Sequence, residues 1–206
     1  MPGRSGDRKD QILQVLAEML ESPRPEKITT AALAAKLNVS EAALYRHFAS
    51  KAQMFEGLIE FIEKTLFSLI NKLTAEEKSG LSGPGQVEGI LSLLLGFARK
   101  NPGMTRVLIG DALVNENDRL QARVNQLHDR LETTLKQALR FQTNDKENPV
   151  SIDVSAQANM LMCYVVGRWH QFAKSGFKRD PMEYWEAQRK EVLLGLAIKV
   201  PAHNRG

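Results

Sequence analysis

The sequence predicts an all-α protein, and three observations along its 206 residues lead to that fold class. Apolar residues recur at the three- and four-residue spacing of a helix, and no segment shows the two-residue alternation typical of a half-buried strand. Ser, Thr and Asn stand where helix N-caps are expected, and Pro and Gly stand where helices should stop. No internal repeat is present. We therefore expect a series of helices joined mostly by short turns.

The first two helices can be placed from their apolar spacing and caps. Apolar residues between Ile12 and Leu20 recur at helical spacing, and this helix should end before Pro23. Thr29 or Thr30 is a good N-cap for an alanine-rich helix over residues 31–37.

A turn, a very short helix and a long helix should follow. Asn38 tolerates the left-handed conformation that a tight helix–helix turn needs. Ser40 can cap a helix of barely two turns, and Ser50 with Gln53 forms a capping-box pattern at the start of a helix to about Leu73.

The rest of the chain is predicted to be helical with two loops. The loops are the glycine-rich residues 79–85 and a polar connection over residues 141–151. Asn101 should cap a helix that has Pro102 in its first position. The other expected helices span residues 86–100, 152–174 and 181–199. A further helix should begin at residue 118 and carry an apolar stripe of Leu120, Val124, Leu127, Leu131, Leu135 and Leu139.

Two short helices on a first helix, joined by a tight turn, form a helix-turn-helix, in which the second helix enters the DNA major groove. Leu44 and Phe48 would face inward. We predict that Lys51, at the start of the next helix, meets a phosphate together with free backbone N–H groups. A surface helical hairpin that binds no DNA is the alternative. The predicted DNA-binding residues are Thr29, Thr30, Ser40, Ala42, Ala43, Tyr45, Arg46, His47 and Lys51.

Composition favours a soluble cytoplasmic protein and gives no sign of an enzyme. No apolar run approaches the roughly 18 residues of a membrane span, and the single cysteine, Cys163, cannot form an internal disulfide. The net charge of +4 is divided equally between residues 1–51 and the remainder, so charge alone does not indicate nucleic-acid binding. No cofactor or metal is expected, because no catalytic motif is present and the four histidines have no metal-ligand spacing: His47, His128, His170 and His203.

Two apolar residues stand outside the predicted core stripes and suggest a second surface. At about 100° per residue, the stripe of the long helix runs through Phe55, Ile59, Ile62, Leu66, Leu69 and Leu73. Phe61 lies about 120° from that stripe, and Leu93 lies equally far from the stripe of residues 86–100. Gly96 and Lys100 share the outer face with Leu93, which is typical of a groove for an apolar and acidic peptide. Packing on a neighbouring helix or a dimer mate is the alternative.

The segment between Ala156 and Trp169 is apolar nearly all round, so it should be covered on more than one side. We predict that it forms a dimer interface with the last helix through Trp185, Val192, Leu193 and Leu196, and that a charged residue at Val165 breaks the dimer. Met160 and Met162 could instead line a small-molecule cavity, although methionine at helical spacing is more often core.

The stretch ITTAALAAKLNVSEAALYRHFASK (residues 28–51) resembles the DNA-binding domain of the TetR/AcrR family. FEGLIEFIE, LLLGFARKNPGMTRVLIGDALV and DRLQARVNQL are similar to the nucleoid occlusion factors of that family. The resemblance implies a TetR-like fold, with a three-helix helix-turn-helix domain at residues 1–51 and a helical dimerisation and partner-binding domain at residues 52–206.

The resemblance also implies a nucleoid-associated homodimer that binds palindromic DNA, with one or several dimers per site. When bound to DNA, such a protein antagonises polymers of the division protein FtsZ; a ligand-responsive transcriptional repressor is the alternative. At positions 69 and 100 the resemblance leads us to expect arginines, but this chain has Leu69 and Lys100. The replacements would weaken charge pairing with the bound FtsZ tail. The FtsZ C-terminal tail would be bound by Phe61, Leu69, Leu93, Gly96, Lys100 and Asn101.

Overall fold

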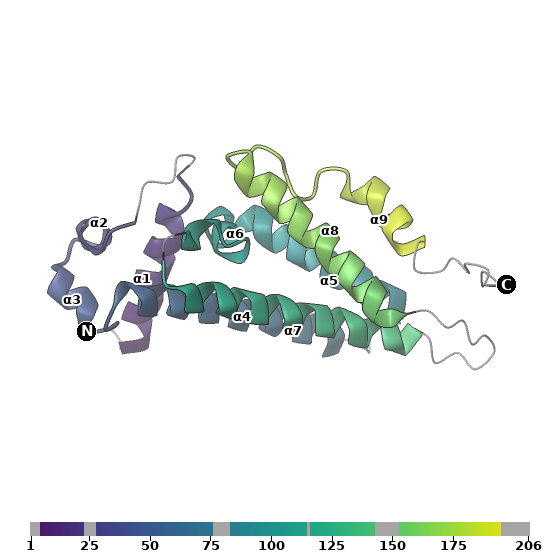
Figure 1. The fold of residues 1–206 in the computed structure, drawn as a ribbon, viewed down its shortest axis with the longest axis horizontal. Helices are drawn as coiled ribbons and strands as arrows, with labels where there is room; N and C mark the ends of the chain where they lie inside the picture. The colour runs from purple at the N-terminus through teal and green to yellow at the C-terminus, as the bar shows by residue number, and fades with distance from the viewer. Residues whose placement is uncertain (1–4, 23–27, 76–82, 115, 143–152, 195–206) are drawn as a thin grey trace.

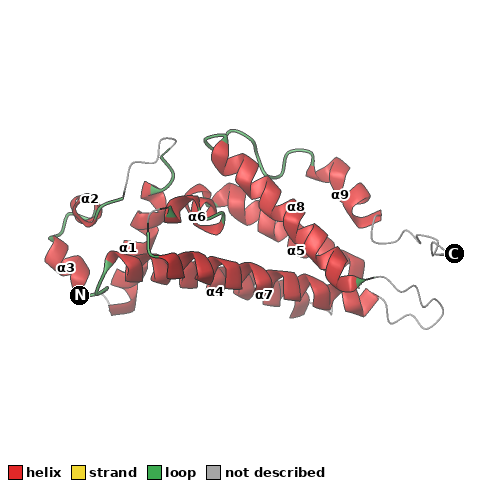
Figure 2. Ribbon diagram, viewed as in Figure 1, coloured by secondary structure: helices red, strands yellow, loops and turns green. Residues whose placement is uncertain are grey.

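The computed structural model describes residues 5–22, 28–75, 83–114, 116–142 and 153–194. These residues form helices and loops and contain no β-strand (Figure 2), as the sequence predicts. None of the described helices is long and apolar enough to cross a membrane. The elements are α1 (Ser5–Met19), α2 (Thr30–Lys36), α3 (Glu41–Tyr45), α4 (Lys51–Ala75), α5 (Gly83–Lys100), α6 (Pro102–Leu108), the 3-10 helix η2 (Asp111–Leu113), α7 (Asp118–Gln142), α8 (Val154–Lys174) and α9 (Trp185–Leu194).

The molecule is elongated, with a small head at one end and a helical body behind it (Figure 1). Helices α1, α2 and α3 form the head, and α4 leads from the head into the body, where it runs beside α7. Helix α8 packs across α7 and α5, and α9 packs on α5. The short helix α6 lies between the head and the body and contacts α1, α4, α5 and α8.

The turns of the head follow the predicted caps. The hydroxyl oxygen of Thr29 accepts a hydrogen bond from the Ala32 N–H at 3.1 Å, so Thr29 and not Thr30 caps α2. Asn38 has φ of 55°, the left-handed conformation expected of it. The Ser40 hydroxyl accepts from the Ala43 N–H at 3.3 Å and caps α3. These caps stabilise helices too short to form alone.

The capping box of α4 is present with one change. The Ser50 hydroxyl accepts from the Gln53 N–H at 3.2 Å, as predicted. The Gln53 amide oxygen reaches one residue further back than in the standard motif and accepts from the Ala49 N–H at 2.9 Å. Two backbone donors at the head–body junction are therefore satisfied by local side chains.

The core stripe of α4 was predicted correctly except for Leu69 and, in part, for Leu73, which is only half-buried but packs against the core. Phe55, Ile59, Ile62 and Leu66 are buried, but Leu69 is 40% exposed because a cleft opens beside α4 at that height. Residues on either side of this stripe are buried as well: Met54, Leu58, Phe67 and Ile70. All six residues of the predicted α7 stripe are buried.

Two helix starts differ from the prediction. Helix α5 begins at Gly83, inside the predicted loop, because the first turn of a helix tolerates proline and the chain has Pro84 there. Asn101 occupies the N-cap position of α6 but makes no side-chain cap bond; its amide donates to the Phe97 carbonyl at 2.8 Å and so caps the end of α5. The remainder of the predicted loop, residues 79–82, lies outside the described residues.

Helix α8 is anchored on α5 near its C-terminal end, and the burial of its middle corrects one interface prediction. Asp153 caps α8, and the Trp169 indole donates to the Leu94 carbonyl at 3.0 Å. Val165 is fully buried inside the subunit, so it cannot contact a second copy. A charged residue at Val165 would therefore damage the fold of the subunit, and the proposed dimer test with Val165 was wrong.

The last helix starts later than predicted. Residues 181–184 form a turn in which Tyr184 has φ of 66°, and α9 begins at Trp185. The Trp185 indole donates to the Ser92 hydroxyl at 2.9 Å, which anchors α9 on α5. Trp185 is thus buried in the subunit, while Leu196 and most of the predicted polar connection at 141–151 lie outside the described residues.

Candidate functional site

The head presents α3 on its outer surface. Leu44 is 1% and Phe48 is 7% exposed, and both pack into the head as predicted. The opposite face of α3 is open, and Tyr45 is 46% exposed. The predicted DNA-binding residues on this face are exposed at Ser40, Ala42, Tyr45 and Arg46 and half-buried at Ala43 and His47. The structure thus leaves all six at least partly accessible to solvent at and around α3.

The two threonines before α2 have different partners. Thr29 uses an oxygen lone pair as the cap of α2, which leaves its hydroxyl hydrogen able to donate to a phosphate. The Thr30 hydroxyl donates to the Glu41 carboxylate at 2.5 Å and so joins the start of α2 to the start of α3. Thr30 therefore has a role in orienting α3.

Lys51 lies at the junction of the head and the body. Its ammonium forms an ion pair with the Glu116 carboxylate just before α7, and it lies 5.7 Å from the centre of the Phe55 ring. Both side chains of the pair are largely buried. A phosphate at this position would compete with Glu116 for the Lys51 ammonium. This ion pair could not be predicted from the sequence, because the two residues are 65 positions apart.

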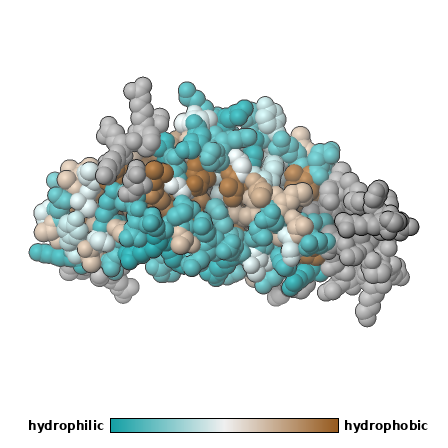
Figure 3. Space-filling model, viewed as in Figure 1, coloured by the Kyte–Doolittle hydropathy of each residue, from teal (hydrophilic) through white to brown (hydrophobic). Residues whose placement is uncertain are grey.

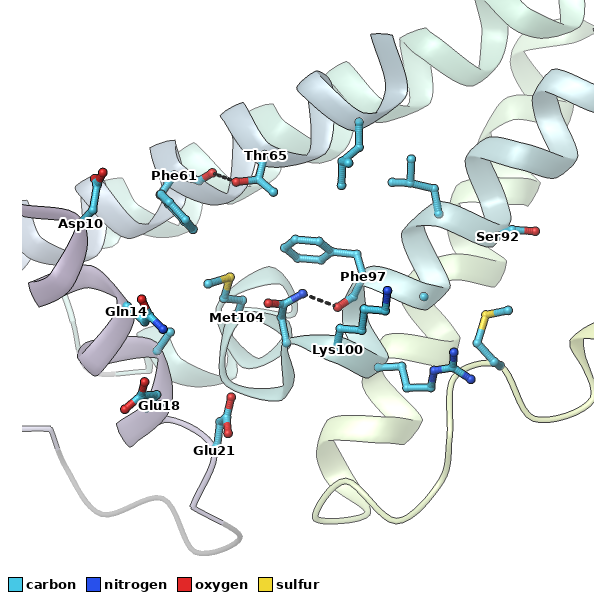
Figure 4. A pocket seen from close by; sticks show the side chains of 17 residues that line it. Asp10, Gln14, Glu18, Glu21, Phe61, Thr65, Ser92, Phe97, Lys100 and Met104 are labelled. Atoms are coloured by element: carbon cyan, nitrogen blue, oxygen red, sulfur yellow. Dashed lines mark hydrogen bonds between the residues drawn. The ribbon is translucent and has the colours of Figure 1, made fainter. Parts of the chain in front are cut away.

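A cleft of about 810 Å³ lies between α1, α4, α5 and α6. Figure 4 shows Phe61 and Thr65 on one side, Phe97 and Lys100 on α5, Met104 on α6, and Gln14 and Glu18 on α1. All the residues predicted to bind a partner segment line this one cleft: Phe61, Leu69, Leu93, Gly96, Lys100 and Asn101.

The middle of the cleft is apolar and has open space at its glycine. Phe61 and Leu93 are half-buried and also pack against the core, so each side chain lines the cleft with only part of its surface. A Cβ atom added at Gly96 would meet nothing within 4 Å. No packing contact therefore requires glycine there, although glycine within a helix costs about 1 kcal/mol relative to alanine.

The two ends of the cleft carry opposite charges. Arg99 and Lys100, both exposed, lie at the end of α5. Asp10, Glu18 and Glu21 line the cleft from α1 and the residues after it, with Gln14 between them (Figure 4). Burial, followed by the neighbouring Glu18 carboxylate, raises the pKa of Glu21 above its ordinary value. We did not predict this acidic wall, although its residues recur at helical spacing and that pattern is visible in the sequence.

Helix α1 is packed so closely on α6 that the junction requires glycine. A Cβ atom added at Gly103 would lie 1.9 Å from the backbone oxygen of Ala17 and 3.2 Å from the Glu21 side chain. Distances below 3.0 Å essentially never occur for a Cβ atom. Gly103 thus allows the backbones of α1 and α6 to touch, which fixes the acidic wall relative to the floor of the cleft.

Helix α8 presents small and apolar residues at its outer surface. Met160 is 49% exposed, Cys163 is exposed, and a Cβ atom added at Gly167 would meet nothing within 4 Å. These residues follow one another at helical spacing. The face of the molecule that α7 and α8 turn to the viewer carries hydrophobic atoms across its middle, between hydrophilic regions (Figure 3).

The alternative of a small-molecule cavity finds no support from the two methionines. Met162 is buried in the core and Met160 points outward, and neither lines the cleft. His128 is half-buried, its ring centre lies 5.9 Å from that of Trp169, and burial lowers its pKa. Within the described part of the chain, no group of His, Cys, Asp and Glu residues is arranged to hold a metal ion.

Comparison with known families matches both parts of the chain. Residues 12–58 match the family described as bacterial regulatory proteins, tetR family, and residues 85–196 match the family described as tetracyclin repressor-like, C-terminal domain. The nucleoid occlusion factor SlmA of Alteromonas mediterranea is 56% identical over 182 residues, which cover 88% of this chain and 92% of that protein. SlmA of Idiomarina loihiensis is 50% identical over 188 residues, covering 91% and 94%.

Solved structures of transcriptional regulators share the fold. The fatty acid degradation regulator FadR from Bacillus halodurans superposes with a TM-score of 0.75 at 13% identity, covering 95% of this chain and 98% of that chain. A TetR-like regulator from a Rhodococcus species gives a TM-score of 0.69 at 22% identity, covering 96% and 99%. At such identities the likeness concerns the fold alone.

Proposed function

The chain belongs to the TetR family of bacterial regulatory proteins and, within it, to the SlmA nucleoid occlusion factors, and from that membership we propose that it binds chromosomal DNA and, when bound, antagonises polymers of the division protein FtsZ. The matching family is described as bacterial regulatory proteins, and the proposal includes no catalytic step. In this proposal the protein is associated with the nucleoid.

We assign DNA binding to residues 1–51 and dimerisation and partner binding to residues 52–206. The exposed face of α3 supports the first assignment, because small Ala42 allows the backbone to approach the bases while Tyr45 and Arg46 reach toward the phosphate backbone. The caps of α2 and α3 hold this face in place without help from a ligand.

A homodimer would pair the outer faces of α8. Met160, Cys163 and Gly167 form an apolar surface with room for a close neighbour, which supports this arrangement. A two-fold axis there would set the two copies of α3 about 34 Å apart, one turn of DNA, so the preferred sites would be palindromic.

The FtsZ C-terminal tail is the proposed occupant of the cleft. The observation that carries the proposal is that the six positions expected from the family to bind this tail, on α4, on α5 and at its end, line a single cleft. Four of them match the family pattern, and Leu69 and Lys100 replace the expected arginines. A short peptide would place an apolar side chain in the open space at Gly96 and a carboxylate near Lys100.

Helix α4 connects the two proposed sites without a break. It begins at Lys51, beside the DNA-binding head, and reaches Phe61 after ten residues, about 15 Å further along its axis. Because binding equilibria are linked reciprocally, DNA should tighten tail binding by the same factor that the tail tightens DNA binding. Titration of each ligand with and without the other measures this factor. If the affinity for each ligand is the same with and without the other, the two sites are not coupled.

Co-sedimentation of FtsZ polymers, with and without operator DNA, tests the function. We expect polymer to be lost only when the protein and DNA are both present. An effect of a lipophilic small molecule on DNA affinity, with no effect on polymers, would favour the ligand-responsive repressor.

One variant pair tests the cleft directly. Leu69 is exposed in the cleft, so Leu69→Asp should abolish the effect on polymers with little loss of stability. Ser68→Asp is the matched control, because Ser68 is its exposed neighbour but lines a different groove, formed by α4 and α7 with Glu60 and Arg123. Phe61→Ala and Leu93→Asp should also abolish the effect, but both residues contact the core, so we expect some loss of melting temperature with them.

A further inference from the structure

The wall of the cleft formed by α1 has the opposite charge to the wall formed by α5. Asp10, Glu18 and Glu21 lie on the α1 side, and Arg99 and Lys100 lie on the α5 side. The predicted site, which the family suggested, comprises only residues of α4, of α5 and of its end. The acidic side is therefore a part of the cleft for which the proposed function has no use yet.

Among the residues that the structure describes, Glu18 and Glu21 are only weakly compensated by positive charge. Glu18 has Lys36 as its ion-pair partner at 4.0 Å, at the limit of an ion pair, and both side chains are nearly half exposed. Burial of Glu21, followed by repulsion from the neighbouring Glu18 carboxylate, raises the pKa of Glu21. A cation bound between them would relieve that repulsion.

We propose that the α1 wall binds a basic residue of the same segment that places its apolar anchor beside Gly96 and its acid beside Lys100. The inference rests on the proposed function and adds the orientation in which the segment lies in the cleft. The partner segment is bipolar, with its base at Glu18 and Glu21 and its acid at Arg99 and Lys100.

The position of the wall makes the inference specific to a peptide. The same carboxylates repel a polyanion, so DNA or an anionic membrane surface fits the cleft poorly. The apolar middle of the cleft requires a side chain between the two charges. The close contact at Gly103 holds α1 against α6, so the distance between the two charged walls is set before the segment binds.

The test is a double-mutant cycle with the full-length protein, operator DNA and a synthetic peptide of the FtsZ C-terminal tail. One altered peptide has its lysines and arginines replaced by glutamine, and a second has its acids replaced by amides. The protein variant is Glu18→Gln with Glu21→Gln. The control variant is Glu60→Gln, an exposed carboxylate next to Phe61 in sequence that lines the other groove of α4.

We expect the base-free peptide to bind the unaltered protein and the Glu60→Gln protein about two- to fivefold more weakly than the tail at 0.1 M salt. On the Glu18→Gln, Glu21→Gln protein this difference should vanish, while the acid-free peptide should lose the same affinity on all three proteins. The proposed role of the α1 wall is refuted if the base-free peptide binds the unaltered protein as tightly as the tail does. It is also refuted if the loss of peptide affinity persists in the Glu18→Gln, Glu21→Gln protein. If the tail itself does not bind, the proposed function fails and this inference falls with it.

Discussion

Two glycines that line or support the cleft should respond in opposite ways to the same substitution. Gly96 lies inside α5 with no atom within 4 Å of an added Cβ, so Gly96→Ala should stabilise the protein by about 1 kcal/mol through helix propensity alone. For a chain of this length, that corresponds to a rise in melting temperature of about 2–4 °C.

Gly103→Ala should destabilise the protein. The new Cβ would start 1.9 Å from the Ala17 oxygen and must reach at least 3.0 Å, so α1 and α6 would have to separate by about 1.1 Å. Overpacking of this kind costs about 1–3 kcal/mol, which outweighs any gain in helix propensity. Differential scanning calorimetry of both variants at one protein concentration measures the two signs.

A third variant separates stability from function. Gly96→Leu should keep a melting temperature at or above that of the unaltered protein, because leucine is a good helix former and the space is open. The same side chain should fill the middle of the cleft and abolish tail binding without changing DNA affinity. A lower melting temperature for Gly96→Ala would refute the statement that the space beside Gly96 is open. Full tail binding by Gly96→Leu would refute the cleft as the binding site of the tail.

Three further predictions concern DNA binding, assembly and pH. Lys51→Ala should weaken specific and non-specific DNA binding alike and lower the salt slope of binding by about one, whereas Glu116→Gln should free the Lys51 ammonium and tighten DNA binding. Fluorescence anisotropy across a salt series measures both effects. An unchanged DNA affinity for Lys51→Ala would reject the phosphate contact. Met160→Glu should place a charge in the α8 interface and break the dimer, and light scattering at low micromolar concentration that still gives a dimer would move the interface elsewhere. Burial lowers the pKa of His128, so the unfolded chain takes up the proton first and stability should fall as the pH drops below about 6.5; melting temperatures between pH 7.5 and 5.5 should fall less for His128→Leu.

Local chemistry made the helices predictable. Thr29 and Ser40 each cap a backbone N–H three residues further on, and Asn38 acts through its own backbone conformation, so their roles follow from the sequence alone. Amphipathic spacing likewise identified the α7 stripe, because a helix covered along one side follows the 100° rule closely. Where a local group has two partners available, prediction was less secure: the Asn101 amide caps α5 behind it and not α6 ahead of it.

Contacts between distant segments decided what the sequence could not show. Leu69 has the correct angle for the core, but the cleft between α4 and α5 opens beside it and leaves it 40% exposed. Phe67 lies off the stripe, yet the Arg130 guanidinium covers its ring at 3.9 Å and buries it. The acidic wall belongs to the cleft only because Gly103 brings α1 against α6, and that approach has no signature in the residues of α1 itself.

The chain has a single thiol, and its location makes it a chemical reporter of assembly. Cys163 is exposed on the outer face of α8, between Met160 and Gly167. A maleimide should modify it rapidly in the separated subunit and slowly once a second subunit covers that face. Labelling rates measured against protein concentration would therefore give the dissociation constant of the dimer, and the Met160→Glu protein would supply the rate for the open thiol. No engineered cysteine would be needed, and every label would lie close to the proposed two-fold axis.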